Sequence, residues 1–144
     1  ISIKDVAIEY FTTWQKIHWK AIESAYKSSP YFEHLEEILK PNYEKQTKYL
    51  FDFNLNLIEL LVGFLEIKTN IETTKEYIHS YPANFTDLRG ISPKENSHQL
   101  LDPNKKVIPY YQVFSHKMPF VPNLSILDLI CNEGLLSIDI LKQP

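Results

Sequence analysis

The sequence has a single cysteine, Cys131, among its 144 residues. One cysteine cannot form a disulfide within the chain, whereas secreted domains of this size often depend on several. We therefore expect a reducing compartment and a cytoplasmic protein. The same scarcity excludes a zinc site built from cysteines, and no two histidines have the spacing of a helical zinc site, so no metal is expected.

Glycine is almost as rare, with only Gly63, Gly90 and Gly134 in the chain. A P-loop or a dinucleotide-binding fingerprint needs several glycines within a few residues of one another. Neither motif is present, and the sequence leaves any cofactor unknown.

A concentration of basic charge is also absent. The formal net charge is −3, and the basic residues are scattered, with only Lys105 and Lys106 adjacent. Proteins that bind nucleic acid or an anionic membrane usually carry a basic stripe or patch. We therefore expect no nucleic-acid partner.

Long hydrophobic runs are missing too. The longest apolar stretch, Leu57–Leu65, is interrupted by Glu59 and Gly63. A membrane-spanning helix needs about 20 consecutive apolar residues. No membrane span is expected.

The residues that are abundant indicate a globular chain. Apolar residues make up 44% of the sequence, charged residues 23% and aromatic residues 13%. Each aromatic ring can bury roughly 150–250 Å², so a chain of this length can build a sizeable core. We expect one domain over residues 1–144.

The apolar spacing predicts an α+β fold, namely a helix-rich single domain with a small sheet. Helices are predicted over Trp14–Lys27, Tyr31–Leu39, Tyr43–Glu66 and Asn123–Asn132, with a last turn or two over Leu135–Leu141. Strands are predicted at Ile1–Ile8, Ile67–Ile71 and Val107–Phe114, and a long connector over Tyr81–Pro109. An N-terminal segment absent from this chain is expected to complete the sheet.

Two polar residues fall on apolar helix faces. Asn54 lies opposite the charged stripe of its predicted helix, and His18 lies among the apolar residues of the first helix. A buried amide needs a partner, so Asn54 either makes a structural hydrogen bond or contacts a ligand. His18 is either a satisfied core residue or a general acid–base group.

The segment Pro122–Gly134 is the densest candidate site. Ser125, Asp128 and Asn132 align at spacings of three and four on an otherwise apolar helix. In a structural interpretation, Asn123 or Ser125 caps the helix and Asp128 favours its positive end. In a functional interpretation, Asp128 is a base or binds substrate hydroxyl groups, with Ser125 and Asn132 beside it. Cys131 faces the apolar side and is expected to be inert packing.

Arg89 is the only arginine in the chain and lies in the predicted connector. Its planar guanidinium could hold a carboxylate or a phosphate of a ligand. The alternative is a local ion pair with Asp87 or Glu95.

Five segments, in this order along the chain, are similar to those of a known family. They are Trp14–Lys20, Ser24–Phe32, Asp52–Asn54, Tyr110–Phe114 and Phe120–Asp128. Together they resemble the WbqC-like protein family, and most closely its branch in Bacteroidetes, whose central connector is short. Family members are longer at the N-terminus, so the chain resembles roughly the C-terminal two-thirds of a member.

The resemblance implies a bacterial protein whose relatives are encoded among genes for O-antigen and other surface polysaccharides. It implies modification of an activated sugar, by acyl or aminoacyl transfer. The positions that match the family and carry over as candidate site residues are His18, Asn54, Tyr111, Gln112, Asn123, Ser125, Asp128 and Asn132.

Two hypotheses follow. The first is a cytoplasmic enzyme of O-antigen-type polysaccharide biosynthesis, in which Asp128 or His18 acts as general base. The other candidate residues would bind a nucleotide-sugar or another small polar ligand, and all of them would converge in one pocket. The second is a non-catalytic binding or scaffold protein of a cell-envelope biosynthesis pathway, with an interface of exposed aromatic residues such as Tyr31, Phe32, Tyr110 and Phe114. The sequence leaves the oligomeric state unknown.

Overall fold

The computed structural model describes residues 2–91 and 108–142. The chain divides into two compact units, one of residues 1–69 and 108–143 and the other of residues 70–107 with the last residue. The expectation of a single domain over residues 1–144 stays a prediction.

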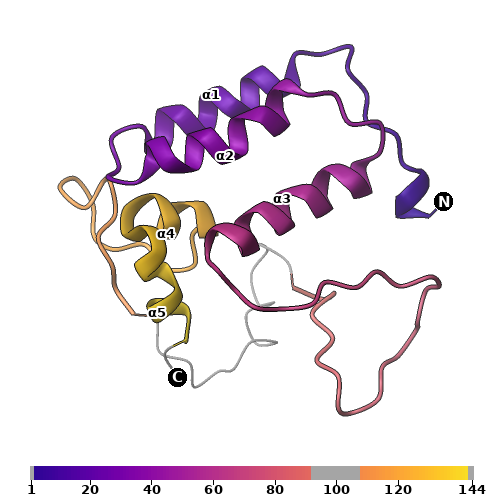
Figure 1. The fold of residues 1–144 in the computed structure, drawn as a ribbon. Helices are drawn as coiled ribbons and strands as arrows, with labels where there is room; N and C mark the ends of the chain where they lie inside the picture. Colours follow the sequence, from indigo (N-terminus) through magenta and orange to yellow (C-terminus); the bar gives the residue numbers. More distant parts are fainter. Residues whose placement is uncertain (1, 92–107, 143–144) are drawn as a thin grey trace. The chain divides into compact units, whose positions relative to one another are not determined.

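The first unit contains all the helices of the described residues (Figure 1). They are the 3-10 helix η1 (Ile3–Asp5), the α-helices α1 (Trp14–Tyr26), α2 (Phe32–Glu44), α3 (Leu50–Phe64) and α4 (Ile126–Glu133), the 3-10 helix η3 (Gly134–Leu136) and α5 (Ser137–Lys142). None of these helices has the length and apolar character needed to cross a membrane.

Helix α2 lies at the centre of this unit, since it packs against α1, α3 and α4. Helices α1 and α2 lie side by side, joined by the short turn around Ser29 (Figure 1). The buried face of α2 carries Phe32, Leu35 and Leu39 at spacings of three and four, the period of one helix face. Helix α2 continues through Pro41 to Glu44, beyond the end predicted at Leu39.

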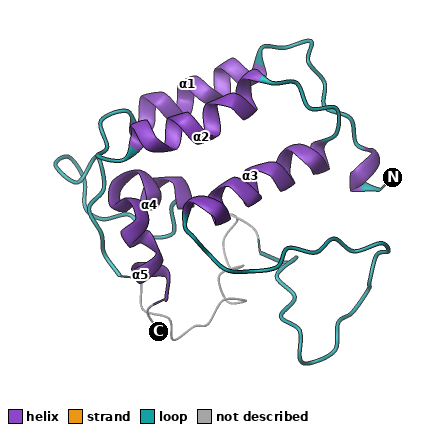
Figure 2. Ribbon diagram, viewed as in Figure 1, coloured by secondary structure: helices purple, strands orange, loops and turns teal. Residues whose placement is uncertain are grey.

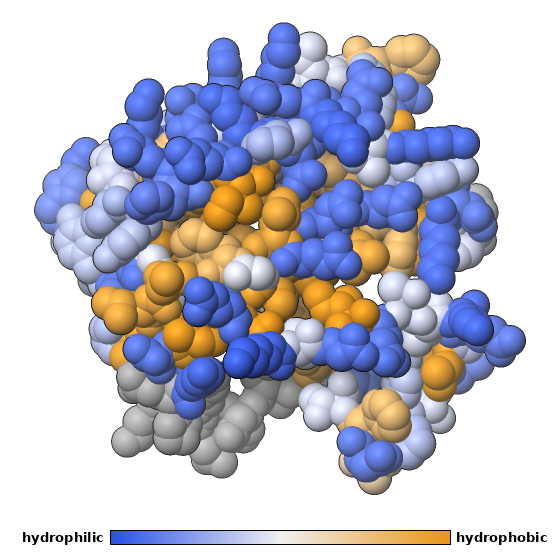
Figure 3. Space-filling model, viewed as in Figure 1, coloured by the Kyte–Doolittle hydropathy of each residue, from blue (hydrophilic) through white to orange (hydrophobic). Residues whose placement is uncertain are grey.

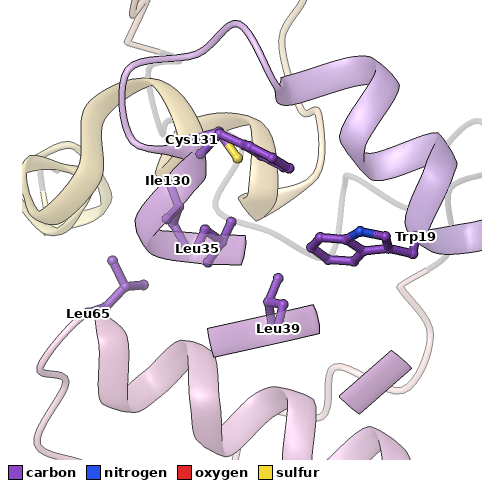
Figure 4. Close-up of a cluster of buried hydrophobic side chains, with 7 residues drawn as sticks. Trp19, Leu35, Leu39, Leu65, Ile130 and Cys131 are labelled. Carbon is purple, nitrogen blue, oxygen red and sulfur yellow. The ribbon is translucent and has the colours of Figure 1, made fainter. Parts of the chain in front are cut away.

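The core lies where α1, α2 and α4 meet, with one residue from the end of α3 (Figure 4). Its buried members are Trp19, Phe32, Leu35, Leu39, Leu65, Ile130 and Cys131. Burying a side chain of the size of leucine or phenylalanine contributes about 1.5–3 kcal/mol, so these contacts dominate the packing.

The long helix predicted over Tyr43–Glu66 is interrupted at residues 45–49. Two backbone hydrogen bonds connect this break to the N-terminal segment: Ile8 N donates to Lys48 O at 2.9 Å, and Leu50 N donates to Val6 O at 2.9 Å. The Tyr10 hydroxyl group also donates to Thr47 O at 2.8 Å. Because these contacts are distant in sequence, helix periodicity could not show them.

The prediction of an α+β fold is wrong, because the described residues contain helices and loops but no strand (Figure 2). The N-terminal segment forms η1 and then a single antiparallel bridge between Ala7 and Tyr49. One bridge is too short a pairing to make a sheet. Residues 67–71 form a loop, as the turn hydrogen bond from Thr69 N to Ile67 O shows.

The strand predicted over Val107–Phe114 is also absent from its described part; Val107 lies outside the described residues. Residues 110–112 are irregular, and the hydrogen bonds of Tyr111 and Gln112 each involve a side chain instead of the backbone-to-backbone bonds of a neighbouring strand. Tyr111 N donates to Glu133 Oε1 at 3.3 Å, and the Gln112 side chain bonds to the backbone of Val121. An extended-looking sequence without a partner strand therefore remains a loop.

The C-terminal helices agree with the prediction. Gly134 is the C-cap of helix α4 and has a φ of 57°. A Cβ atom at this residue would overlap the ring of Tyr31. Tyr31 N also donates to Cys131 O at 3.0 Å. These two contacts attach α4 to the α1–α2 turn.

The second unit, in its described residues 70–91, is a loop, and residues 81–91 agree with the first part of the connector predicted over Tyr81–Pro109. Arg89 organises it. The guanidinium bonds to both carboxylate oxygens of Asp87 and to Ile78 O at 2.7 Å, and it lies over the rings of Tyr77 and Tyr81. The local ion pair with Asp87 is confirmed, whereas Glu95 lies outside the described residues.

Candidate functional site

The first turn of α4 positions the main candidate residue, Asp128. Ser125 is the N-cap, and its hydroxyl group accepts a hydrogen bond from Leu127 N at 3.3 Å. Asn123 precedes the cap with a positive φ of 56°, which turns the chain into the helix. Asp128 lies in the first turn, where the free N–H groups of a helix favour a negative charge. The structural interpretation of Ser125 as a cap is therefore confirmed, and both Asn123 and Ser125 are exposed.

The carboxylate of Asp128 is buried, with only 5% of the residue exposed. Two side-chain donors bond to the same oxygen: the Tyr110 hydroxyl group lies 2.7 Å from Oδ2, and Gln112 Nε2 lies 3.2 Å from it. A buried carboxylate needs such donors, because an ionised group loses its hydration on burial. We call Tyr110, Gln112, Asp128 and Asn132 the Asp128 cluster.

Gln112 joins this cluster to the loop that precedes α4. Its Nε2 donates to Val121 O at 2.8 Å, and its Oε1 accepts from Val121 N at 2.9 Å. One side-chain amide thus pairs with both backbone groups of Val121, as a neighbouring strand would. The pairing closes the loop of residues 113–120 and fixes the distance between Gln112 and the start of α4.

Asn132 lies one helical turn after Asp128 on the same face of α4. Its Nδ2 donates to Asp128 O at 2.7 Å, and the residue is 5% exposed. The amide oxygen, Oδ1, is buried and has no hydrogen-bond partner within the part of the chain that the structure describes. A buried acceptor without a donor costs about 1–3 kcal/mol, so this oxygen is a candidate ligand contact.

Burial and the charge of Asp128 affect the acidity of its neighbours. Burial, the largest cause, raises the pKa of Tyr110; with the raising effect of the hydrogen bond and charge of Asp128 and the lowering effect of Gln112, the pKa is about 12. Burial also raises the pKa of Tyr26, with a second contribution from the charge of Asp128. Both phenols therefore stay protonated at neutral pH, and Tyr110 acts as a donor to the carboxylate.

Cys131 is buried in the core, as the expectation of inert packing required. Burial, the largest cause, and the negative charge of Asp128 raise the pKa of its thiol to about 11, while a hydrogen bond with Ser29 opposes the increase. The thiol is therefore protonated at neutral pH and has little nucleophilic character.

The structure does not bring His18 or Asn54 to the Asp128 cluster. His18 is exposed on α1, where its ring meets the edge of Trp14 at a centroid distance of 5.2 Å. Asn54 is exposed on α3, where the buried residue is its neighbour Phe53. Apolar residues lie around most of the circumference of α3, and some of them, such as Ile58, are exposed. The position of Asn54 among apolar residues on the helical wheel therefore did not show that it is buried.

Tyr111 is also outside the cluster. Its side chain is exposed, and only its backbone N–H bonds to Glu133. The residue that sequence reasoning missed is Tyr110. In an extended segment, residues two apart point to the same side, so Tyr110 and Gln112 share a face that Tyr111 does not. This alternation in the sequence could have indicated that Tyr110 lies beside Gln112.

The cluster therefore contains a buried carboxylate, a phenol and two amides. Within residues 2–91 and 108–142, no group of three or more His, Cys, Asp or Glu side chains could hold a metal ion. Chemically, the arrangement can accept hydrogen bonds and a proton from a bound molecule at Asp128.

Comparison with known proteins gives a match to the WbqC-like protein family over residues 1–106. The matched range ends before Tyr110, so it does not extend to the Asp128 cluster. An uncharacterised protein of Mycobacterium tuberculosis is 31% identical over 67 residues, which are 46% of this chain and 29% of that protein. The alignment thus spans less than a third of this relative. No solved structure matches the chain.

Proposed function

Because the chain belongs to the WbqC-like protein family, we propose that it is an enzyme of bacterial surface-polysaccharide biosynthesis that acts on an activated sugar in the cytoplasm. Asp128 is the general base, and Gln112, Asn132 and Tyr110 surround the bound group. The observation that carries the proposal is the convergence of Tyr110 and Gln112 on one oxygen of the buried Asp128 carboxylate.

The support is chemical. A carboxylate held by a phenol and an amide is fixed in position, and pre-positioned groups are what general base catalysis requires. Perturbed acidity is frequent at functional sites, and the pKa values of Tyr26 and Tyr110 are both raised beside Asp128. His18 and Asn54 have no part in this version, because both are exposed elsewhere.

The proposed reaction is acyl or aminoacyl transfer to the sugar. Asp128 accepts a proton from a hydroxyl or amino group of the acceptor as the oxygen or nitrogen attacks the carbonyl carbon of the acyl donor. The new C–O or C–N bond forms, the bond to the leaving group breaks, and the proton passes from Asp128 to the leaving group. One carboxylate is sufficient for both proton transfers.

The test is a thermal-shift screen of the full-length protein against nucleotide-sugars and acyl donors. A ligand that binds the folded state raises the melting temperature. We expect a shift that Asp128→Asn abolishes and that Asp139→Asn, a change of an exposed aspartate on α5, leaves intact. Equal shifts of the melting temperature in the wild type and in Asp128→Asn would show that Asp128 does not take part in ligand binding.

A second candidate function is a non-catalytic binding or scaffold protein of a cell-envelope pathway. Exposed apolar side chains favour it, and Figure 3 shows such surface between hydrophilic stretches. Exposed apolar residues in the C-terminal helices and in the segment before them include Tyr111, Phe114, Met118, Leu124, Leu135 and Leu136. Two aromatic residues expected at such an interface are not available, because Phe32 is buried and Tyr110 bonds to Asp128.

This candidate predicts a stable complex with another biosynthetic protein. Leu136→Glu, at a residue that is 58% exposed, would abolish the complex without changing the stability of the chain. A complex that survives this change, or a ligand shift that depends on Asp128, would favour the enzyme.

A further inference from the structure

We propose that the group bound beside Asp128 is a primary ammonium, as in an amino sugar, rather than a phosphate, a carboxylate or an amide. This assignment rests on the proposed function, and it specifies which part of the substrate lies in the Asp128 cluster. The ammonium is the bound form; it releases one proton to solvent before the nitrogen attacks, and Asp128 accepts the second proton during attack. Three properties of the Asp128 cluster support this assignment: the balance of hydrogen-bond donors and acceptors, the charge, and the small size of the group that can bind.

The donors of the cluster are already used within the protein. The Tyr110 hydroxyl group gives its hydrogen to Asp128 Oδ2 at 2.7 Å. The two hydrogens of Gln112 Nε2 go to Val121 O at 2.8 Å and to Asp128 Oδ2 at 3.2 Å. Asn132 Nδ2 donates to the backbone oxygen of Asp128 at 2.7 Å. These side chains therefore have little donor capacity left for an anionic or carbonyl ligand.

Acceptor capacity, in contrast, remains. An ionised carboxylate can accept about four hydrogen bonds, and the two donors described use only part of that capacity at Asp128. Asn132 Oδ1 is buried and has no donor within the described residues. The orientation of this amide is fixed, because exchanging its oxygen and nitrogen would bring two oxygens together at 2.7 Å.

Asp128 and Asn132 are four residues apart and lie on one face of α4. Side chains at this spacing are neighbours on a helix, and each leans toward the N-terminus, so the Asn132 amide extends toward the turn that carries Asp128. The hydrogen bond from Asn132 to the Asp128 backbone confirms that direction. The unpartnered oxygen and the carboxylate thus belong to one face of α4, and in this assignment one ligand with several N–H groups serves both.

The charge balance selects a cation. The ion pairs formed between described residues involve Glu23, Glu36 and Asp87, and so leave Asp128 without a basic partner among them. Glu133, on the same helix, adds a second carboxylate, which accepts from Tyr111 N. A phosphate or carboxylate placed here would be repelled, whereas an ammonium would neutralise the buried charge.

The surroundings also suit a small cation. Tyr26 and Tyr110 lie close enough to Asp128 for its charge to act on both phenols, and Phe120 packs on Tyr110 at a ring-centroid distance of 5.4 Å. Both phenols are protonated at neutral pH, so they carry no charge that would oppose a cation. Because Asp128, Gln112 and Asn132 are each about 5% exposed, the group that reaches them is small, and an ammonium is smaller than a phosphate.

The experiment compares glucosamine, N-acetylglucosamine and glucose on the ¹⁵N-labelled full chain at pH 7, with the Gln112 side-chain amide as the NMR probe. Glucosamine is expected to shift this resonance and to bind at least tenfold more tightly than either neutral sugar. Asp128→Asn is expected to weaken glucosamine binding at least tenfold, and Asp139→Asn to leave it unchanged.

Asn132→Leu gives a second test, which does not depend on the folding of the Asp128 variant. Leucine has a similar size and removes the unpartnered oxygen, so we expect unchanged or higher thermal stability together with weaker glucosamine binding. A purely structural asparagine would leave binding unchanged, and that result would overturn the assignment.

The possible failures are distinguishable. If glucose or N-acetylglucosamine binds as tightly as glucosamine and still requires Asp128, the ammonium assignment is wrong while the proposed function stands. If none of the three sugars and no ligand of the thermal-shift screen requires Asp128, both are wrong.

Discussion

The hydroxyl oxygen of Tyr110 lies 2.7 Å from Oδ2 of Asp128, and Gln112 Nε2 approaches the same oxygen to 3.2 Å. Tyr110 and Asp128 belong to different parts of the unit, the loop before α4 and the first turn of α4. Their bond therefore couples the conformation of a loop to a buried negative charge. This relationship gives the first two predictions.

Tyr110→Phe removes a hydrogen-bond donor from the buried carboxylate while keeping the ring that packs on Phe120. Loss of a bond to a buried charged group costs about 1–3 kcal/mol. We expect the free energy of unfolding in urea to fall by about that amount. Tyr111→Phe is the control, because the Tyr111 side chain is exposed, and it should change stability by less than about 0.5 kcal/mol. Equal effects of the two changes would contradict the assigned bond.

Gln112→Glu replaces the amide nitrogen with a second carboxylate oxygen. The new group faces Val121 O and Asp128 Oδ2, both acceptors, so the variant should be less stable at pH 7 and recover stability as the pH falls and one carboxylate becomes protonated. Thermal unfolding between pH 4 and 8 measures this slope. Gln15 donates to Lys45 O at an exposed position, so the stability of Gln15→Glu should lack this pH dependence. If the stability of Gln112→Glu had the same pH dependence as that of the wild type, the Gln112 side chain would not bond to Val121 and Asp128.

Gly134→Ala and Gly63→Ala should have effects of opposite sign. At Gly134, a φ of 57° and the Tyr31 ring 2.7 Å from the added carbon make alanine strained, with a cost of about 1–3 kcal/mol. At Gly63, on the exposed side of α3, no atom lies within 4 Å of the added carbon. Alanine there should stabilise the helix by up to about 1 kcal/mol. Melting temperatures of the two variants measured side by side test both statements, and a tolerated Gly134→Ala would contradict the packing of Tyr31 on α4.

Cys131 should react slowly with thiol reagents in the folded protein. Its pKa of about 11 leaves about one thiol in a thousand ionised at pH 8, and the residue is completely buried. We expect the rate of disulfide-exchange labelling to rise by several orders of magnitude in denaturant. Ser28→Cys adds an exposed thiol as an internal standard, and this thiol should react first. Simultaneous labelling of both thiols in native buffer would show that the core around α4 opens readily.

Asp87 should titrate at an unusually low pH. Hydrogen bonds from the Arg89 side chain and backbone lower its pKa to about 2. A carboxylate whose folded pKa is lowered stabilises the loop above its ordinary pKa and loses that contribution as the pH falls toward 2. NMR titration of the Asp87 carboxyl carbon measures the midpoint. In Arg89→Ala the midpoint should return toward the ordinary range, and a midpoint that stays near 2 would mean that another group lowers it.

Local signals in the sequence predicted the helices better than the fold class. The helices predicted over Trp14–Lys27 and Asn123–Asn132 correspond to α1 and α4, whereas Phe32, expected to be exposed, is buried on α2. The predicted strands were wrong because a strand depends on its partner, and a partner cannot be read from the strand's own residues. Ala7 forms a single bridge, with Tyr49, and Gln112 bonds to Val121 through its side chain instead of its backbone.

The candidate site was predicted in the same uneven way. Asp128 and Asn132, which a polar stripe on an apolar helix singled out, are buried and connected, and Gln112, which only the family resemblance singled out, bonds to Asp128. The burial of Asn54 and His18 was inferred from helical wheels, which assume that every apolar residue faces the core. Helix α3 is apolar around most of its circumference, so the wheel could not tell which part of it is covered.

The packing of Tyr31 against Gly134 has a consequence for the order of folding. The two residues are about a hundred positions apart, whereas α1 and α2 are joined by a turn of a few residues. Closing a long loop costs more conformational entropy than closing a short one, and contacts of high sequence separation form slowly. The α1–α2 hairpin should therefore form first and present Tyr31 as a docking point for α4. The Asp128 cluster, assembled on α4, would then be among the last parts of this unit to become structured, and ligand binding would report on completed folding.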